Sequence, residues 1–193
     1  LGFTLDLSNP IFPEKAVLSD EILKSIGNPN QKLIGIAPFA QYESKVYPLD
    51  LMQEVISKLA VNQDQTILLF GGGKKETELL DAFAKPFGNV INVAGKIKFT
   101  QELQLISNLD VMLSMDSGNA HIAAMLGVKV ITLWGATHPY AGFSPFNQPI
   151  ENALVADRNL FPKLPTSVYG NKKVEGYEDA MRTILPEEVV AKL

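Results

Sequence analysis

The sequence contains no cysteine, only two histidines and a single tryptophan among its 193 residues. Without cysteine it cannot form disulfides or thiolate metal sites, and two histidines are too few for a histidine-based metal cluster. No apolar run reaches the roughly 18 residues of a membrane span. With a net charge of −4, the chain has little attraction for nucleic acid or an anionic membrane surface. The sequence also lacks an initiator methionine and a signal-peptide pattern, so we expect a fragment of a longer protein.

What the sequence does have is a regular alternation of apolar strands and amphipathic helices. We expect strands at 33–37, 66–70, 90–93, 111–114 and 128–133, with a weaker signal at 152–156. We expect helices at 48–59, 76–87, 99–109, 118–126, 178–184 and 186–193. The strands are apolar throughout rather than alternating, which is typical of a parallel sheet covered on both faces. The pattern predicts an α/β fold, a Rossmann-like doubly wound parallel sheet over 33–193 with a loop at 157–175. Residues 1–32 are expected to be a lead-in or interdomain segment without a strong element.

The most informative motif joins the strand at 111–114 to the helix at 118–126. It reads Asp116-Ser117-Gly118, with His121 one turn into the helix. Unpaired N–H groups and the helix dipole make a helix start suitable for phosphate, and a glycine there removes a side chain that would block a ligand. Either Asp116 or Ser117 could instead cap the helix. His121 leans back toward the helix start, where it either packs or donates to a phosphate.

Three further strand-end loops lie on the same predicted edge of the sheet, where ligands bind in open α/β folds. In the first, Ala37–Ala40 is followed by Lys45, which can place a point charge on a diphosphate; the alternative is a solvated lysine. In the second, Gly71–Gly73 matches neither a Walker loop nor GxGxxG and could be a flexible turn. In the third, Thr137 and His138 could close the rim of a pocket, although a turn is the more ordinary role for His138.

These residues resemble glycosyltransferase family 9, the heptosyltransferases that build the lipopolysaccharide inner core. The resemblance rests on the run Asp116–Ala124, on the loop Gly135–Thr137, on Lys45–Pro48 with tyrosine in place of tryptophan, and on residues 180–189. It implies the C-terminal, donor-binding domain of a GT-B glycosyltransferase. The donor would be ADP-heptose or a related nucleotide sugar, used without a cofactor or metal. An N-terminal domain absent from this chain would bind the lipid-linked saccharide acceptor and supply the catalytic base, so no catalytic residue is expected here.

The resemblance also implies a set of donor-binding residues: Lys45, Ala40, Gly71, Gly72, Asp116, Ser117, Gly118, His121 and Thr137. Lys45 and residues 116–118 would hold the diphosphate and sugar, and the glycine loop would lie near adenosine. Two departures leave room for another nucleotide or sugar. Family members often carry a carboxylate in the loop after the second strand that binds the ribose, and Glu76 is the nearest acidic residue to that place here. Residues 157–175 also lack the cysteine that many relatives carry there. The same residues are also compatible with a non-catalytic nucleotide-binding module or an epimerase-type GT-B protein. A cytoplasmic location, peripheral at the inner membrane face in the full-length protein, is expected.

Overall fold

The computed structural model describes residues 2, 4, 6–27 and 31–193. Its strands are β1 Lys32–Ala37, β2 Gln65–Leu69, β3 Val90–Asn92, β4 Val111–Met115, β5 Lys129–Trp134 and β6 Ala153–Val155. Its α-helices are α1 Asp20–Ile26, α2 Leu49–Ala60, α3 Gly73–Ala84, α4 Phe99–Ile106, α5 Gly118–Met125 and α6 Pro186–Lys192. The strands form one sheet in the order β3-β2-β1-β4-β5-β6, and every neighbouring pair is parallel. This confirms the Rossmann-like α/β prediction.

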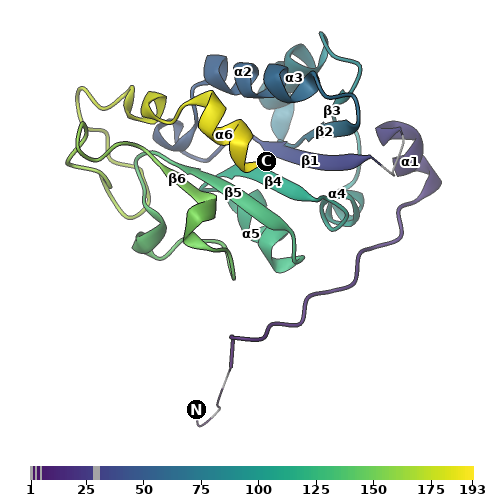
Figure 1. The fold of residues 1–193 in the computed structure, drawn as a ribbon, viewed down its shortest axis with the longest axis horizontal. Helices are drawn as coiled ribbons and strands as arrows, with labels where there is room; N and C mark the ends of the chain where they lie inside the picture. Colours follow the sequence, from purple (N-terminus) through teal and green to yellow (C-terminus); the bar gives the residue numbers. More distant parts are fainter. Residues whose placement is uncertain (1, 3, 5, 28–30) are drawn as a thin grey trace.

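Helices cover both faces of the sheet, which explains why its strands are apolar throughout. Figure 1 shows α2 and α3 on one side of the sheet and α5 on the other. The extended segment before α1 contacts the domain, since the N–H of Ala16 donates to the hydroxyl of Ser107 at 3.1 Å. One core cluster joins the sheet to α2, α3 and α6, and a second joins it to α1, α4 and α5. Burial of apolar surface on both sides is the main stabilising contribution. Of the described helices, none is both long and apolar enough to cross a membrane.

The expected elements differ from the structure at several places; α4, for example, ends at Ile106 rather than at residue 109. The sequence pattern does not predict α1, although Ser19 accepts a hydrogen bond from the N–H of Ile22 at its start and acidic residues occupy its first turn. α3 begins at Gly73 rather than at residue 76, and the helix predicted at 178–184 is only a 3₁₀ turn, Ala180–Thr183. That short turn is anchored from outside, because the Tyr47 hydroxyl donates to the carbonyl of Ile184 at 2.7 Å.

Candidate functional site

The carboxyl ends of β1 and β4 lie side by side, because Ala37 pairs with Ser114 in the register. The helix that follows β1 packs on one face of the sheet, and the helix that follows β4 packs on the other. A crevice opens where the chain leaves neighbouring parallel strands in opposite directions. A pocket of about 350 Å³ lies at this edge. Its lining includes several of the predicted donor-binding residues: Ala40, Gly71, Gly72, Ser117 and Gly118.

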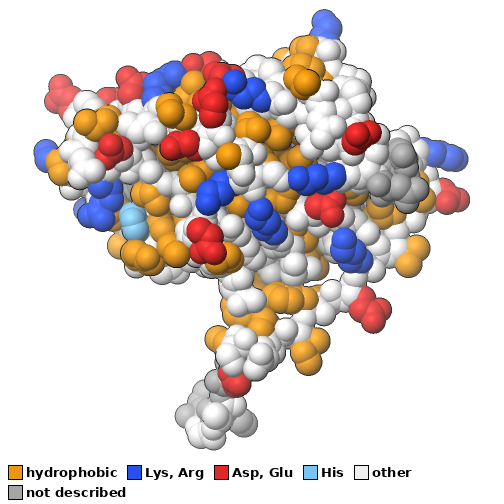
Figure 2. Space-filling model, in the orientation of Figure 1, with side chains coloured by type: hydrophobic (Ala, Val, Ile, Leu, Met, Phe, Trp, Pro, Cys, Tyr) orange, Lys and Arg blue, Asp and Glu red, His pale blue; other side chains and the backbone are white. Residues whose placement is uncertain are grey.

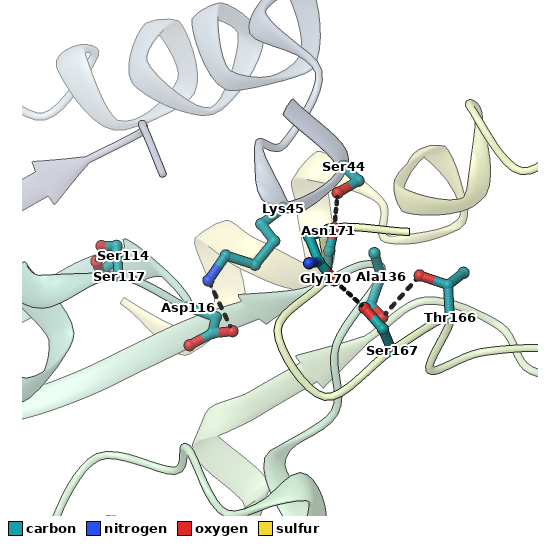
Figure 3. A network of polar contacts seen from close by, with 10 residues as sticks. All are labelled: Ser44, Lys45, Ser114, Asp116, Ser117, Ala136, Thr166, Ser167, Gly170 and Asn171. Atoms are coloured by element: carbon teal, nitrogen blue, oxygen red, sulfur yellow. Dashed lines mark hydrogen bonds and ion pairs between the residues drawn. The ribbon is translucent and has the colours of Figure 1, made fainter. Parts of the chain in front are cut away.

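Lys45 and Asp116 form an ion pair across the crevice. The Lys45 Nζ lies 3.1 Å from Asp116 Oδ2, and the side chains are only 12% and 6% exposed. Figure 3 shows the ammonium group of Lys45 reaching from its loop toward the carboxylate at the end of β4. Water screens this pair less than it screens a surface pair. The structure therefore brings together two residues that the sequence placed 71 positions apart.

The loop at 157–175 holds the lysine in place, which the sequence did not reveal. Gly170 has φ +72°, and a Cβ there would lie 2.9 Å from both Cγ and Cδ of Lys45. The hydroxyl of Ser44 donates to the carbonyl of Gly170, and the N–H of Thr166 donates to the carbonyl of Ala136 at 2.9 Å. These contacts lie together in Figure 3. The aliphatic stem of Lys45 thus packs directly against the backbone of this loop.

The first turn of α5 lacks the side-chain cap that the sequence would allow. Ser117 is the N-cap residue but makes no side-chain capping hydrogen bond; its hydroxyl lies 3.0 Å from that of Ser114, and Asp116 is paired with Lys45. A Cβ on Gly118 would meet nothing within 4 Å. The capping alternative is therefore wrong for Ser117, and the start of α5 lies beside the pocket with open space at the position of a Gly118 side chain.

The glycine loop after β2 forms another wall of the same pocket. Gly71 is tightly enclosed, since a Cβ there would lie 2.9 Å from Leu80 Cδ1, whereas a Cβ on Gly72 would meet nothing within 4 Å. The N–H of Gly72 donates to Glu76 Oε2 at 2.8 Å. The open backbone at Gly72 lets a ligand approach closely, and the bond to Glu76 fixes a carboxylate at the pocket wall.

The remaining predicted residues are Thr137, His121 and His138, and their surroundings differ. Thr137 is 1% exposed, and its Oγ1 has no hydrogen-bond partner among the described residues. Its methyl group lies 3.0 Å from where a Cβ of Gly170 would be. His121 is half-buried on α5 and is not among the residues that line the pocket. His138 caps a turn, accepting from the N–H of Tyr140 at 3.2 Å; burial, and to a smaller extent the charge of Arg158, lowers the pKa of His138.

Glu102 also lines the pocket, and sequence reasoning missed it. It lies on α4, outside all four strand-end loops, and no local motif marks it. The side chain is half-buried, and burial raises the pKa of the Glu102 carboxyl above its ordinary value. Only the position of α4 along the sheet edge reveals this residue. A cluster of three or more His, Asp or Glu side chains that could hold a metal is absent from the described part of the chain.

Comparison with known sequences identifies one family. The model of glycosyltransferase family 9 (heptosyltransferase) matches residues 3–172. Lipooligosaccharide heptosyltransferase 2 of Haemophilus influenzae is 27% identical over 166 residues, which are 83% of this chain and 46% of that protein. The chain thus spans about half the length of this curated relative.

Comparison with solved structures supports the fold. The ADP-heptose lipopolysaccharide heptosyltransferase II of E. coli superposes with a TM-score of 0.67 and 22% identity, covering 96% of this chain and 53% of that one. The E. coli heptosyltransferase WaaC, in a structure with ADP, gives a TM-score of 0.62 and 19% identity, covering 86% of this chain and 45% of the other. At these identities the superpositions establish the shared architecture alone.

Proposed function

The chain belongs to glycosyltransferase family 9, and on this premise we propose that residues 33–193 bind the nucleotide-sugar donor of an inverting glycosyltransferase. The reaction proposed is transfer of heptose from ADP-heptose to a lipopolysaccharide core acceptor. The lipid-linked acceptor and the catalytic base would belong to a further domain of the whole protein. That protein would work in the cytoplasm, at the inner face of the membrane.

One observation carries this proposal: the buried pair of Lys45 and Asp116 beside the uncapped start of α5. Breaking a glycosidic bond to a diphosphate leaves negative charge on the phosphate oxygens. The ammonium of Lys45 and the N–H groups near Gly118 could stabilise that charge without a metal. Because these donors are already positioned in a partly desolvated crevice, little reorganisation is needed when the charge develops.

The other predicted residues have complementary roles in this proposal. Asp116 accepts hydrogen bonds from sugar hydroxyls while it holds Lys45. The hydroxyl of Thr137, which has no partner among the described residues, gains one from the bound donor. The open backbone at Gly72 receives the nucleoside, and Glu76 accepts from ribose hydroxyls. His121 lies one turn into α5, and because helical side chains lean toward the helix start, we assign its ring to the phosphates.

The test is calorimetric titration of the chain with ADP, UDP and GDP, together with Lys45→Ala. We expect preferential binding of ADP, weakened about tenfold or more in the variant because a charge-assisted hydrogen bond is lost. Lys58→Ala is the matched control, since Lys58 is also ion-paired, to Glu187 at 2.9 Å, but lies on α2 away from the crevice.

The control should bind ADP with unchanged affinity. Equal affinity of wild type and Lys45→Ala would contradict the role of Lys45. A preference for UDP or GDP would retain a nucleotide-sugar domain and reject ADP-heptose. Failure of all three nucleotides to bind would contradict the donor-binding proposal for this chain.

A further inference from the structure

The pocket at the crevice carries charge of one sign. Glu76 and Glu102 both line it, and the described lining contains no lysine, arginine or histidine. Lys45, in contrast, lies at the ion pair with Asp116. The crevice therefore has a positively charged donor group at one place and two carboxylates at another. A ligand that fits it has an anionic end and an end rich in hydrogen-bond donors.

The order of strands indicates where in the crevice the anionic end and the donor-rich end of the ligand would lie. The start of α5 follows β4, whereas Gly71 and Gly72 follow β2, with β1 between them. Glu102 lies in the first turn of α4, and it lines the same pocket as Phe70, Gly71 and Gly72, which follow β2. A nucleotide whose diphosphate lies at α5 and Lys45 would therefore extend its base into this pocket, whose lining includes Glu102.

The contacts of Glu102 give it no structural role in the described part of the chain. It forms neither a hydrogen bond nor an ion pair with another residue that the structure describes. Its neighbour Gln101, by comparison, donates to Glu21 at 2.9 Å and accepts from the N–H of Lys98. Burying a carboxylate without a partner is unfavourable, and such residues concentrate at functional sites. The apolar lining beside it, Phe39, Phe70 and Ile122, suits the flat faces of a nucleobase.

We propose that Glu102 reads the nucleobase by accepting a hydrogen bond from the 6-amino group of adenine. This inference rests on the proposed function and adds the residue that selects the base. A carboxylate offers acceptors only, so it favours a base that presents an amino group and disfavours one that presents a bare ring nitrogen or an oxygen. Glu76, bonded to Gly72, remains available to the ribose.

The test compares ADP with purine riboside 5′-diphosphate, which lacks only the 6-amino group. For the wild type we expect ADP to bind about tenfold more tightly, as for one charge-assisted hydrogen bond. Glu102→Leu should bring the ratio of the two dissociation constants to about one. Glu102→Gln keeps an acceptor oxygen and should retain part of the preference. Glu78→Gln, which removes a carboxylate from the exposed side of α3, should keep the full ratio.

The ratio of the two dissociation constants tests this inference separately from the proposed function. If the wild type binds both diphosphates equally, or if Glu102→Leu keeps the preference, Glu102 does not read the base, although ADP binding that depends on Lys45 would still support the donor site. If Glu102→Leu instead removes a preference for ADP over 2′-deoxy-ADP, the carboxylate contacts ribose and the inference is wrong. If ADP does not bind the wild type, the proposed function and this inference fail together.

Discussion

At the scale of single residues, the crevice holds carboxylates in two different electrostatic situations. Asp116 is almost fully buried but has Lys45 as its counter-ion at 3.1 Å. Glu102 is less buried and has no such partner among the described residues, so burial alone raises its pKa. A paired buried charge is retained at little net cost, whereas an unpaired one destabilises the fold until a ligand supplies the missing contact.

Glu102 should therefore make stability depend on pH. Its folded-state pKa is raised, so the folded chain holds this proton more tightly than the unfolded chain does. Stability consequently falls as pH rises through and above the ordinary value of 4.5. Glu102→Gln cannot titrate, and we expect its Tm at pH 7.5 to exceed that of the wild type by roughly 1–3 °C, a small effect because the site is partly solvated.

The measurement is calorimetric melting from pH 3.5 to 8. The advantage of Glu102→Gln should disappear below about pH 4, where both chains carry a neutral side chain. Glu78→Gln, whose native side chain is 66% exposed, should shift Tm little at any pH. A Glu102→Gln variant that is less stable than the wild type at pH 7.5 would show that the carboxylate has a structural partner.

The sequence predicts the location of the candidate site better than its contacts. Residues such as Gly72 and Ser117 follow strand ends, and topology alone brings strand ends to one edge. The partner of Asp116 could not be predicted in this way. Asp116 pairs with Lys45 instead of capping α5, and Lys45 lies 71 residues away in the loop after β1. Glu102 was missed for the same reason, since it lies on a helix that reaches the pocket only through packing.

At the scale of elements, strands were more predictable than short helices. A strand buried on both faces, such as β4, carries a continuous apolar run that no surface element imitates. α1 has only seven residues, and the turn at 180–183 is fixed by Tyr47 from another part of the chain. α6 is equally short but was predicted, because Pro186 and two acidic residues mark its start. α1 and the turn at 180–183 depend on tertiary contacts more than on local propensity.

The loop at 157–175 should influence ligand binding although it follows none of the strand-end motifs. Gly170→Ala places a Cβ at positive φ, which costs about 1–2 kcal/mol, and against the stem of Lys45. We expect Tm to fall by about 2–8 °C and the dissociation constant for ADP to rise several-fold, measured by melting and calorimetric titration.

Gly176→Ala, one residue beyond this loop, is the matched control. Gly176 also has positive φ, +79°, but a Cβ there would meet nothing within 4 Å. It should lose a similar amount of stability and keep the wild-type affinity for ADP. If both variants bind ADP as the wild type does, the contact between Gly170 and Lys45 has no bearing on the site.

At the scale of the whole molecule, one sheet is shared by two cores, and this sharing should make the domain unfold as a unit. The two large clusters lie on opposite faces of the same strands, so neither can lose its packing without exposing strands that the other needs. Charged side chains of both signs are interspersed over the face shown in Figure 2. We therefore attribute the expected cooperative unfolding to the two cores and not to a surface of one charge.

Trp134 provides a local probe of this unit, because it is the only tryptophan, is fully buried at the end of β5 and donates to Thr132 Oγ1 at 2.8 Å. We expect its fluorescence and the far-UV circular dichroism of all helices to report the same melting midpoint. ADP at about 100 times its dissociation constant should add about 2.7 kcal/mol and raise both midpoints by roughly 5–10 °C. If ADP raised the fluorescence midpoint alone, the helices would unfold independently of the strand edge that binds the nucleotide, and the shared sheet would not couple its two cores.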